Sequence, residues 1–197
     1  MVAAALLFCW CANTIIGAVA LLLPQDIGGS NAFQGQDIMV KALAETLHRP
    51  CVGVPTLEAI AHSAGPSDFT VSLLPAGRGE LFVQLFSTSS EGVVIALDQP
   101  AHLSPSQIIE KYRTLSKICW AGEGADLYAG LIRESAIQNG YQFTDAAGTD
   151  GWRIVKPASN LAQHVASLAL SRLGEMDVAP NGLRAIYVRP SDAELKL

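Results

Sequence analysis

The stretch FTVSLLPAGRGELFVQLF, residues 69–86, decides the fold. Its two halves, 69–74 and 80–86, are rich in apolar residues, and a Gly-Arg-Gly sequence lies between them. Apolar runs of this length joined by a short glycine-containing segment are typical of two antiparallel strands with a tight turn. The sequence therefore predicts a β-hairpin with Arg78 at its tip. An arginine there could reach a ligand, but an exposed turn residue is the simpler interpretation.

Outward from the hairpin, strands and helices alternate along the chain. The apolar runs and turn residues predict strands at 51–54, 92–97, 117–121 and 186–189, and helices at 36–48, 55–63, 104–115, 125–138 and 157–173. The polar connector 140–151 is predicted to be a flexible loop. This mixture indicates an α/β or α+β fold with two lobes that meet near Pro100.

The composition is that of a folded, acidic chain. Half of the 197 residues are apolar, 16% are charged, and the formal net charge is −5. These values exclude a disordered chain, which would be poor in apolar residues. They also disfavour nucleic acid as a direct partner, because phosphate backbones require clustered Lys and Arg, and the sequence has no basic run.

The N-terminal segment 1–27 is strongly apolar. Residues 2–23 carry no charged side chain, over a length that would span a bilayer. No Lys or Arg precedes Lys41, so the segment lacks the flanking charges that orient a span or mark a signal peptide. We expect residues 17–23 to form a buried core strand, and a membrane-anchored binding module is the alternative. The scattered cysteines indicate buried thiols in a reducing compartment, so a cytoplasmic protein is expected: Cys9, Cys11, Cys51 and Cys119.

One stretch offers a candidate nucleophile. The sequence GGSNA at 28–32 lies between an apolar run and a helix, and it partly matches the Gly-x-Ser-x-Gly turn of serine hydrolases. A small hydrolase built on Ser30 would need His164 as its base. It would also need Asp98 or Asp126 to orient that base, and nothing in the spacing supports either. A turn is the simpler interpretation.

A second glycine-rich stretch, GEG at 122–124, follows a predicted strand and opens a helix. Backbone amides at such a place can hold phosphate, but without a third glycine the pattern is weak, and we expect a plain strand-to-helix turn. Neither Cys9 and Cys11 nor the histidines have partners at metal-ligand spacing: His48, His62, His102 and His164. The sequence thus predicts no catalytic residue, no cofactor and no metal site.

Four blocks occur in the same order as in a known family. They are KALA at 41–44 with Pro50 and VGVPTLEA at 52–59, PAGRGELF at 75–82, GEGA at 122–125 with Tyr128, and YVRPSDAELK at 187–196. They resemble "AKGLA…P-VGVSTLEA", "DARRGEVY", "GxGAxxY" and "YLRPxDAELK" of the TsaB (YeaZ) family. Its members are the non-catalytic partners of the TsaD ligase in bacterial tRNA threonylcarbamoyladenosine formation.

The resemblance implies an α/β chain of the ASKHA (actin-like ATPase, Gcp-like) fold. The family's first strand and its Asp-Thr-Ser-Thr turn have no counterpart, and neither register of its GSFTGLR loop, from Gly28 or from Asn31, supplies the arginine. The first lobe is therefore expected to be incomplete. We expect an apolar segment at 1–27, a remnant of the first lobe at 28–100, and a second lobe with an extended tail at 101–197.

The implied partner is a TsaD-type catalytic paralogue, with a TsaE-type ATPase as a further partner and a homodimer when the ligase is absent. The helix 36–48 is the expected partner-binding surface, because its apolar side chains cover about twice the stripe of ~100° that packing on one core requires. The alternative is that the N-terminal apolar segment covers the second side. The side chains expected to bind the partner are Ile38, Met39, Val40, Ala42, Leu43, Ala44 and Leu47.

Overall fold

The computed structural model describes residues 42, 45–46, 52–144, 151–156 and 160–172. The chain forms two compact units: unit 1 is Met1–Ala59 with Asn160–Ile186, and unit 2 is Ile60–Ser159 with Tyr187–Leu197. The predicted division near Pro100 is not where the chain divides. Strands on both sides of this proline, β3 (Val94–Ala96) and β4 (Ala101–Leu103), pair with the same strand β2.

The predicted hairpin is present at the centre of unit 2. Strands β1 (Ser67–Gly77) and β2 (Glu80–Thr88) pair antiparallel, with Leu74 opposite Phe82. The two loop residues Arg78 and Gly79 have φ values of 54° and 79°. Positive φ at both central residues is the signature of the type I′ turn, whose twist matches that of the flanking strands. The turn chemistry thus explains why a tight hairpin forms here.

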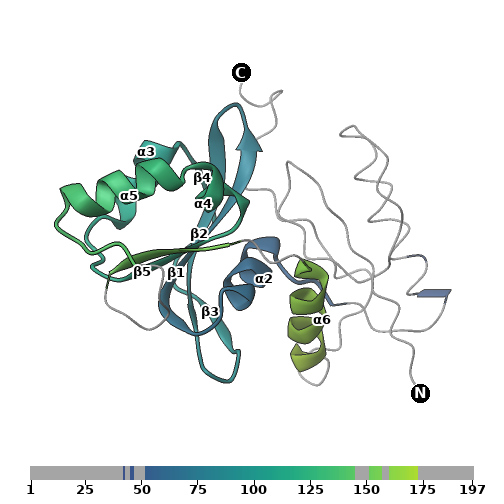
Figure 1. The fold of residues 1–197 in the computed structure, drawn as a ribbon. Helices are drawn as coiled ribbons and strands as arrows, with labels where there is room; N and C mark the ends of the chain where they lie inside the picture. The colour runs from purple at the N-terminus through teal and green to yellow at the C-terminus, as the bar shows by residue number, and fades with distance from the viewer. Residues whose placement is uncertain (1–41, 43–44, 47–51, 145–150, 157–159, 173–197) are drawn as a thin grey trace. The chain divides into compact units, whose positions relative to one another are not determined.

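The hairpin extends into a six-stranded mixed sheet (Figure 1). The strand order is β3-β2-β1-β5-β6, with β4 also on β2, and β5 (Ile118–Ala121) and β6 (Trp152–Val155) run parallel to β1. The sequence predicted β5 but neither β4 nor β6. Both strands are short, at three and four residues, and take their hydrogen bonds from longer or more central neighbours.

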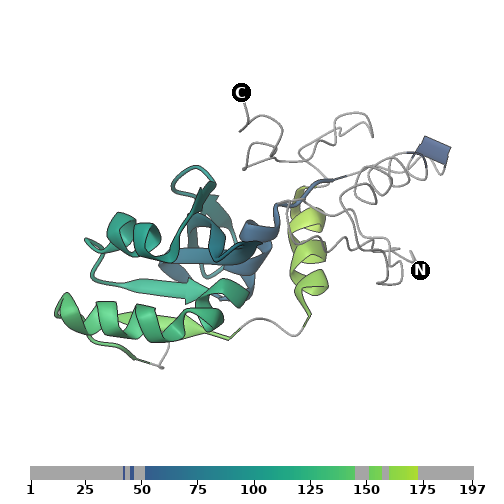
Figure 2. The ribbon, with the colours of Figure 1, turned by 90° about the horizontal axis from the view of Figure 1, so that it is seen from above.

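Two helices, α3 (Pro105–Tyr112) and α5 (Ala129–Gln138), cover one face of this sheet. Both lie on the same side of β5 in Figure 1, and Figure 2 shows the same elements from above. The core between them contains three aromatic rings in edge-to-face contact: Tyr112 lies 6.4 Å from Trp120, which lies 5.1 Å from Trp152. Both tryptophans are fully buried, so the core of unit 2 sits under these helices.

The predicted helix 125–138 is two helices in the structure. A short helix α4 (Glu123–Leu127) follows β5, and α5 begins after Tyr128, whose φ of −108° and ψ of 24° interrupt the run. The N-terminus of α3 agrees with its sequence, because Ser104 and Gln107 form a capping box.

Unit 1 is described through the start of helix α2 (Thr56–Ser63) and through helix α6 (Leu161–Arg172). Val54 and Leu57 are fully buried, and α6 buries Val165 and Leu168. No helix in the described part of the chain combines the length and apolar character needed to cross a bilayer. The apolar segment 1–27 lies outside the described residues.

Candidate functional site

The predicted partner-binding helix is described at three positions. Ala42, Glu45 and Thr46 are helical, in agreement with the helix predicted at 36–48, and all three are exposed. The Thr46 hydroxyl donates a hydrogen bond of 2.7 Å to the Ala42 carbonyl. The other predicted contact residues lie outside the described residues: Ile38, Met39, Val40, Leu43, Ala44 and Leu47. Ala42 alone can therefore be placed, and it is accessible in the isolated chain.

Two of the family-like blocks meet at one end of the sheet. We call this the hairpin–turn cluster, formed by residues 77–80, 122–124 and Tyr128. Gly122 has a φ of 97°, and a Cβ added there would lie 2.3 Å from the carbonyl oxygen of Leu73 in β1. A Cβ on Gly124 would lie 2.9 Å from side-chain atoms of Leu73 and Leu81. Glycine is required because α4 starts in direct contact with the hairpin.

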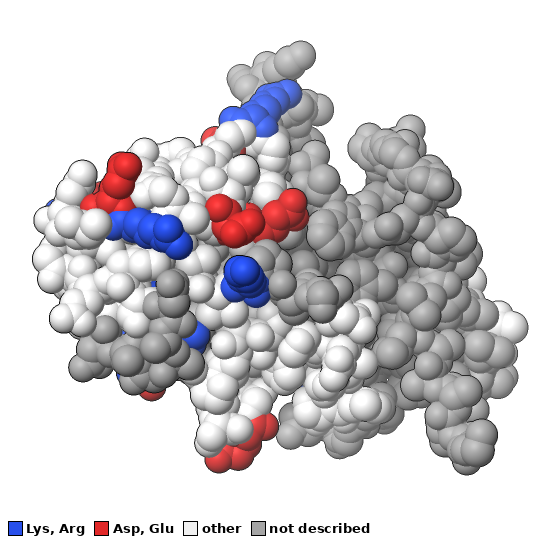
Figure 3. Space-filling view, in the orientation of Figure 1, with Lys and Arg blue, Asp and Glu red and all other residues white. Residues whose placement is uncertain are grey.

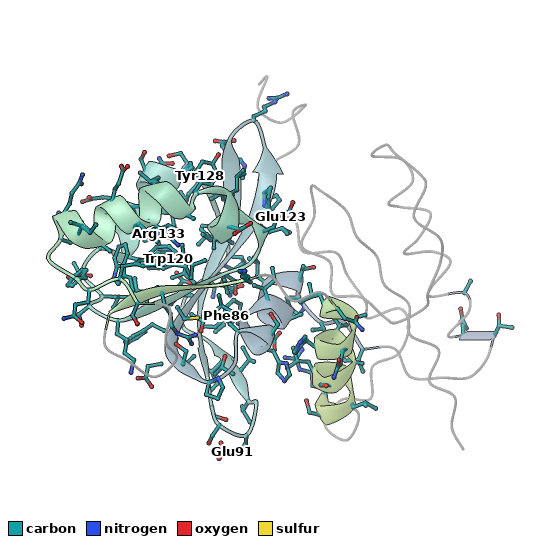
Figure 4. The ribbon with its side chains drawn as sticks, viewed as in Figure 1. Phe86, Glu91, Trp120, Glu123, Tyr128 and Arg133 are labelled. Atoms are coloured by element: carbon teal, nitrogen blue, oxygen red, sulfur yellow. The ribbon has the colours of Figure 1, made fainter. Side chains whose placement is uncertain are left out.

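Side chains complete the contact between the two blocks. The Tyr128 hydroxyl donates a hydrogen bond to the Gly79 carbonyl at 3.2 Å, across 49 residues of sequence. In β4, His102 Nε2 lies 3.2 Å from a carboxylate oxygen of Glu80. Figure 4 shows Glu123 and Tyr128 beside this end of the hairpin. The cluster therefore carries the exposed Arg78 and Glu123, with Glu80 and Tyr128 partly exposed beside them.

The GEG turn is a plain strand-to-helix connection, as predicted. Helix α4 has only five residues, and Gly122 precedes it with no side-chain cap. A helix this short has little macrodipole and few free amides, so it is a poor phosphate site. The role of the two glycines is to let α4 pack against β1 and β2.

The serine-hydrolase alternative finds no support in the placement of Asp98. Its carboxylate accepts hydrogen bonds from the Leu85 backbone amide, from Lys111 and from the Tyr112 hydroxyl, each at 2.7 Å. Burial raises the pKa of Tyr112 well above its usual value, and the Asp98 carboxylate adds to this rise. The Asp98 carboxylate thus joins β2 to α3 and does not orient a base. The second candidate, Asp126, is exposed on α4, and Ser30 lies outside the described residues.

The described cysteine and histidines form no metal site. Cys119 is a free, buried thiol, and burial raises its pKa. Burial lowers the pKa of His164. In the part of the chain that the structure describes, no three His, Cys, Asp or Glu side chains are arranged to hold a metal ion. The remaining cysteines lie outside that part: Cys9, Cys11 and Cys51.

Sequence reasoning missed one buried ion pair in unit 1. The Arg172 guanidinium of α6 donates to the Glu58 carboxylate of α2, which is 7% exposed. Burial raises the pKa of Glu58 despite the opposing effect of Arg172. A single carboxylate within the apolar stretch VGVPTLEAIA was the available signal, because a charge that enters a core needs a partner. The pair ties α2 to α6.

The charges on the surface are mixed. On the face shown in Figure 3, Lys and Arg lie among Asp and Glu over the described residues, without a continuous basic patch. This arrangement matches the sequence, which has no basic run.

Together, these elements define a class of protein. It is an α/β chain with a mixed sheet of order β3-β2-β1-β5-β6, a central hairpin, and helices α3 and α5 on one face. The sequence matches no known family model and no curated protein. Solved structures do match it. YeaZ from Pseudomonas aeruginosa superposes with a TM-score of 0.51 at 17% identity, over 81% of this chain and 68% of that chain.

A second solved structure gives the same result. It is described as an uncharacterized protein with similarity to peptidase YEAZ from Pseudomonas aeruginosa. The TM-score is 0.55 at 18% identity, over 83% of this chain and 70% of that chain. The fold of this protein is therefore the α/β fold of the YeaZ structures, in agreement with the sequence resemblance.

Proposed function

We propose that this chain is a TsaB (YeaZ)-type subunit without a catalytic centre of its own. Its role is to bind and support a TsaD-type ligase in tRNA threonylcarbamoyladenosine biosynthesis in the cytoplasm. The ligase would hold the metal and the reactive adenylate, and this chain would supply a docking surface. A TsaE-type ATPase is the further partner, and a homodimer is the expected form when the ligase is absent.

The observation that supports this proposal most strongly joins sequence to structure. The blocks at 75–82 and 122–128 were matched to the family separately, from the sequence alone. In the structure they touch, through the close approach of Gly124 to Leu81 and through the bond from Tyr128 to Gly79. Chance similarity in two short stretches gives no reason for them to pack together. The YeaZ-like fold adds independent support over four fifths of the chain.

The width of the apolar arc supports the helix 36–48 as the docking surface, because it is about twice what packing on one core requires. Ala42 lies on this arc. Small side chains at such positions allow another helix to approach closely, which suits a helix-to-helix interface.

Single substitutions on the two sides of this helix test the docking surface. The chain is coexpressed with the TsaD-type ligase of the same organism, and the complex is measured by size-exclusion chromatography with light scattering. Val40→Glu places an unpaired charge in the expected interface and should abolish the complex. Glu45→Lys changes charge at an exposed position on the polar strip of the same helix, and it should leave the complex intact.

Each variant is also measured without the ligase. Its mass and circular dichroism spectrum show whether the isolated chain is folded. A folded Val40→Glu chain that no longer binds the ligase supports the proposal. A folded wild-type chain that does not bind the ligase contradicts it. Unfolding of Val40→Glu with no binding defect in Ala44→Glu would show that the helix belongs to the core and that docking uses another surface.

A further inference from the structure

A hollow of about 300 Å³ lies at the other end of the sheet in unit 2, away from the hairpin–turn cluster. The hollow borders Ile118, which is the first residue of β5. The hairpin–turn cluster contains Gly122, which comes directly after the last residue of the same strand. In Figure 4, Tyr128 and Glu91 mark these two ends. The lining residues include Ser67, Asp68, Thr88, Ser89, Lys117 and Arg153.

The strand register explains how residues from four strands form one surface. Thr70 of β1 lies opposite Cys119 of β5, which lies opposite Arg153 of β6. Residues directly opposite one another in a sheet point to the same face. Thr88 lies two residues after Phe86, the partner of Thr70, so it shares that face. The face is opposite to the one that holds the tryptophan core.

The hollow is cationic in a protein whose net charge is −5. Lys117 and Arg153 contribute two positive charges, and Asp68 contributes one negative charge. Lys117 lies 3.8 Å from the Asp68 carboxylate, whose side chain is 78% exposed, so solvent weakens this pair. In the described part of the chain, no carboxylate pairs with Arg153. A guanidinium beside a hollow, with no acidic partner among the described residues, can bind an anion.

A hydroxyl group adds a donor of the kind that an anion needs. The Thr88 side-chain oxygen is fully buried and has no hydrogen-bond partner, although Thr88 lines the hollow. A buried hydroxyl without a partner is costly, and a ligand that accepts its proton would remove that cost. The Ser89 hydroxyl is already engaged, because its oxygen accepts bonds from the amides of Glu91 and Val93. Hydrogen bonds from the Ser90 and Ser89 hydroxyls also lower the pKa of the Glu91 carboxyl.

The neighbouring thiol does not oppose an anion. Cys119 is 1% exposed, and burial raises its pKa, so it stays neutral near pH 7. The volume is at the lower limit of small-molecule sites, enough for a compact ligand.

We propose that this hollow binds a small phosphate-class anion, held by Arg153 and Lys117 with a hydroxyl donor from Thr88. A tetrahedral oxyanion offers several acceptor oxygens, which suits two cations and a hydroxyl that converge from different parts of the sheet. The site shares no residue with the proposed docking helix or with the hairpin–turn cluster, so it does not depend on the proposed function.

Inorganic phosphate is the probe, added to the full-length, isotope-labelled chain at constant ionic strength with chloride as the balancing anion. Backbone amide shifts are followed by NMR. We expect saturable shifts at Ser89, Lys117 and Gly151, with a millimolar dissociation constant. Arg153→Gln should weaken binding about tenfold or more, the loss expected for one charge-assisted contact. Thr88→Val should weaken it by a smaller factor.

Arg113→Gln is the matched control, because this exposed arginine pairs with Glu110 on α3 and does not line the hollow. It should leave the phosphate affinity unchanged. If Arg153→Gln fails to fold, Lys117→Gln at the half-exposed rim serves in its place. The proposal is overturned if phosphate causes no saturable shifts around the hollow. It is also overturned if a folded Arg153→Gln or Lys117→Gln chain binds phosphate as tightly as the Arg113→Gln control.

Discussion

The two ends of the sheet in unit 2 differ in what fills them. At the hairpin–turn cluster, α4 starts against β1 so closely that a Cβ on Gly122 would lie 2.3 Å from a backbone oxygen. At the opposite end, side chains from four strands surround a hollow of about 300 Å³ that contains two cations and an unpartnered hydroxyl. The packed end carries the family-like blocks, and the hollow end carries none. In this molecule the recognisable sequence blocks lie where packing is tight. The polar hollow forms from residues that belong to no such block.

One constraint is common to both ends. Gly151, at the rim of the hollow, has a φ of 125°, and a Cβ there would lie 2.3 Å from the Gln142 carbonyl oxygen. Both ends therefore contain a tightly packed glycine, and they differ in that only one of them has a hollow lined by polar side chains. Predictions of stability follow from this distinction.

The largest effect is expected for Gly122→Ala. A side chain at positive φ that also clashes with a backbone oxygen should lower the free energy of unfolding by about 3 kcal/mol or more. Gly151→Ala should cost a similar amount, for the same reason. The control is Gly130→Ala in α5, where a Cβ meets nothing within 4 Å and φ is not positive. It should raise the free energy of unfolding by about 0.5–1 kcal/mol. Urea denaturation measures all three, and equal costs for Gly122 and Gly130 would refute the packing argument.

A pair of hydroxyl deletions sharpens the comparison at a smaller scale. Tyr128→Phe removes the exposed bond to Gly79 and should lower the free energy of unfolding by about 0.5–1 kcal/mol. Thr88→Val removes a buried hydroxyl that has no partner, so it should be neutral or stabilising by up to about 1 kcal/mol. Thermal and urea unfolding without added phosphate give both values. A clear loss of stability in Thr88→Val would mean that this hydroxyl is satisfied in solution.

The smallest effect concerns the Cys119 thiol. Its pKa in the folded chain is raised above the ordinary value of 9.0, so the unfolded chain loses this proton at lower pH than the folded chain. The thiol therefore stabilises the fold fully below pH 9, and this contribution falls as pH rises toward the folded-state pKa, by at most about 1.4 kcal/mol per pH unit. Cys119→Ala should unfold with a shallower dependence on pH between 9 and 10. Parallel slopes for the two chains would show that burial does not shift this thiol.

The hairpin and the strand-to-helix turn could be predicted because local patterns specify them: apolar runs flank glycines at fixed spacing. Strands β4 and β6 could not, since three or four residues pair only because β2 and β5 are already in place. The sequence predicts two lobes that meet near Pro100. This proline instead lies between two short strands that share β2 as their partner, and the sequence alone does not show this pairing.

The site residues divide in the same way. Tyr128 was noticed through its family-like block, and its bond to Gly79 followed from the fold. Arg153 and Thr88 gave no signal, because their proximity depends on the register across four strands. The Glu58–Arg172 pair joins residues 114 positions apart, so only the lone carboxylate in an apolar stretch pointed to it.

The central claim is that this chain supports a TsaD-type ligase, and the nucleoside content of cellular tRNA tests it most directly. Cells depleted of the chain are compared with cells that re-express the wild-type chain or Val40→Glu, by mass spectrometry of digested tRNA. Threonylcarbamoyladenosine should fall on depletion, return with the wild-type chain, and remain low with a folded Val40→Glu chain. An unchanged threonylcarbamoyladenosine content in depleted cells would contradict the account.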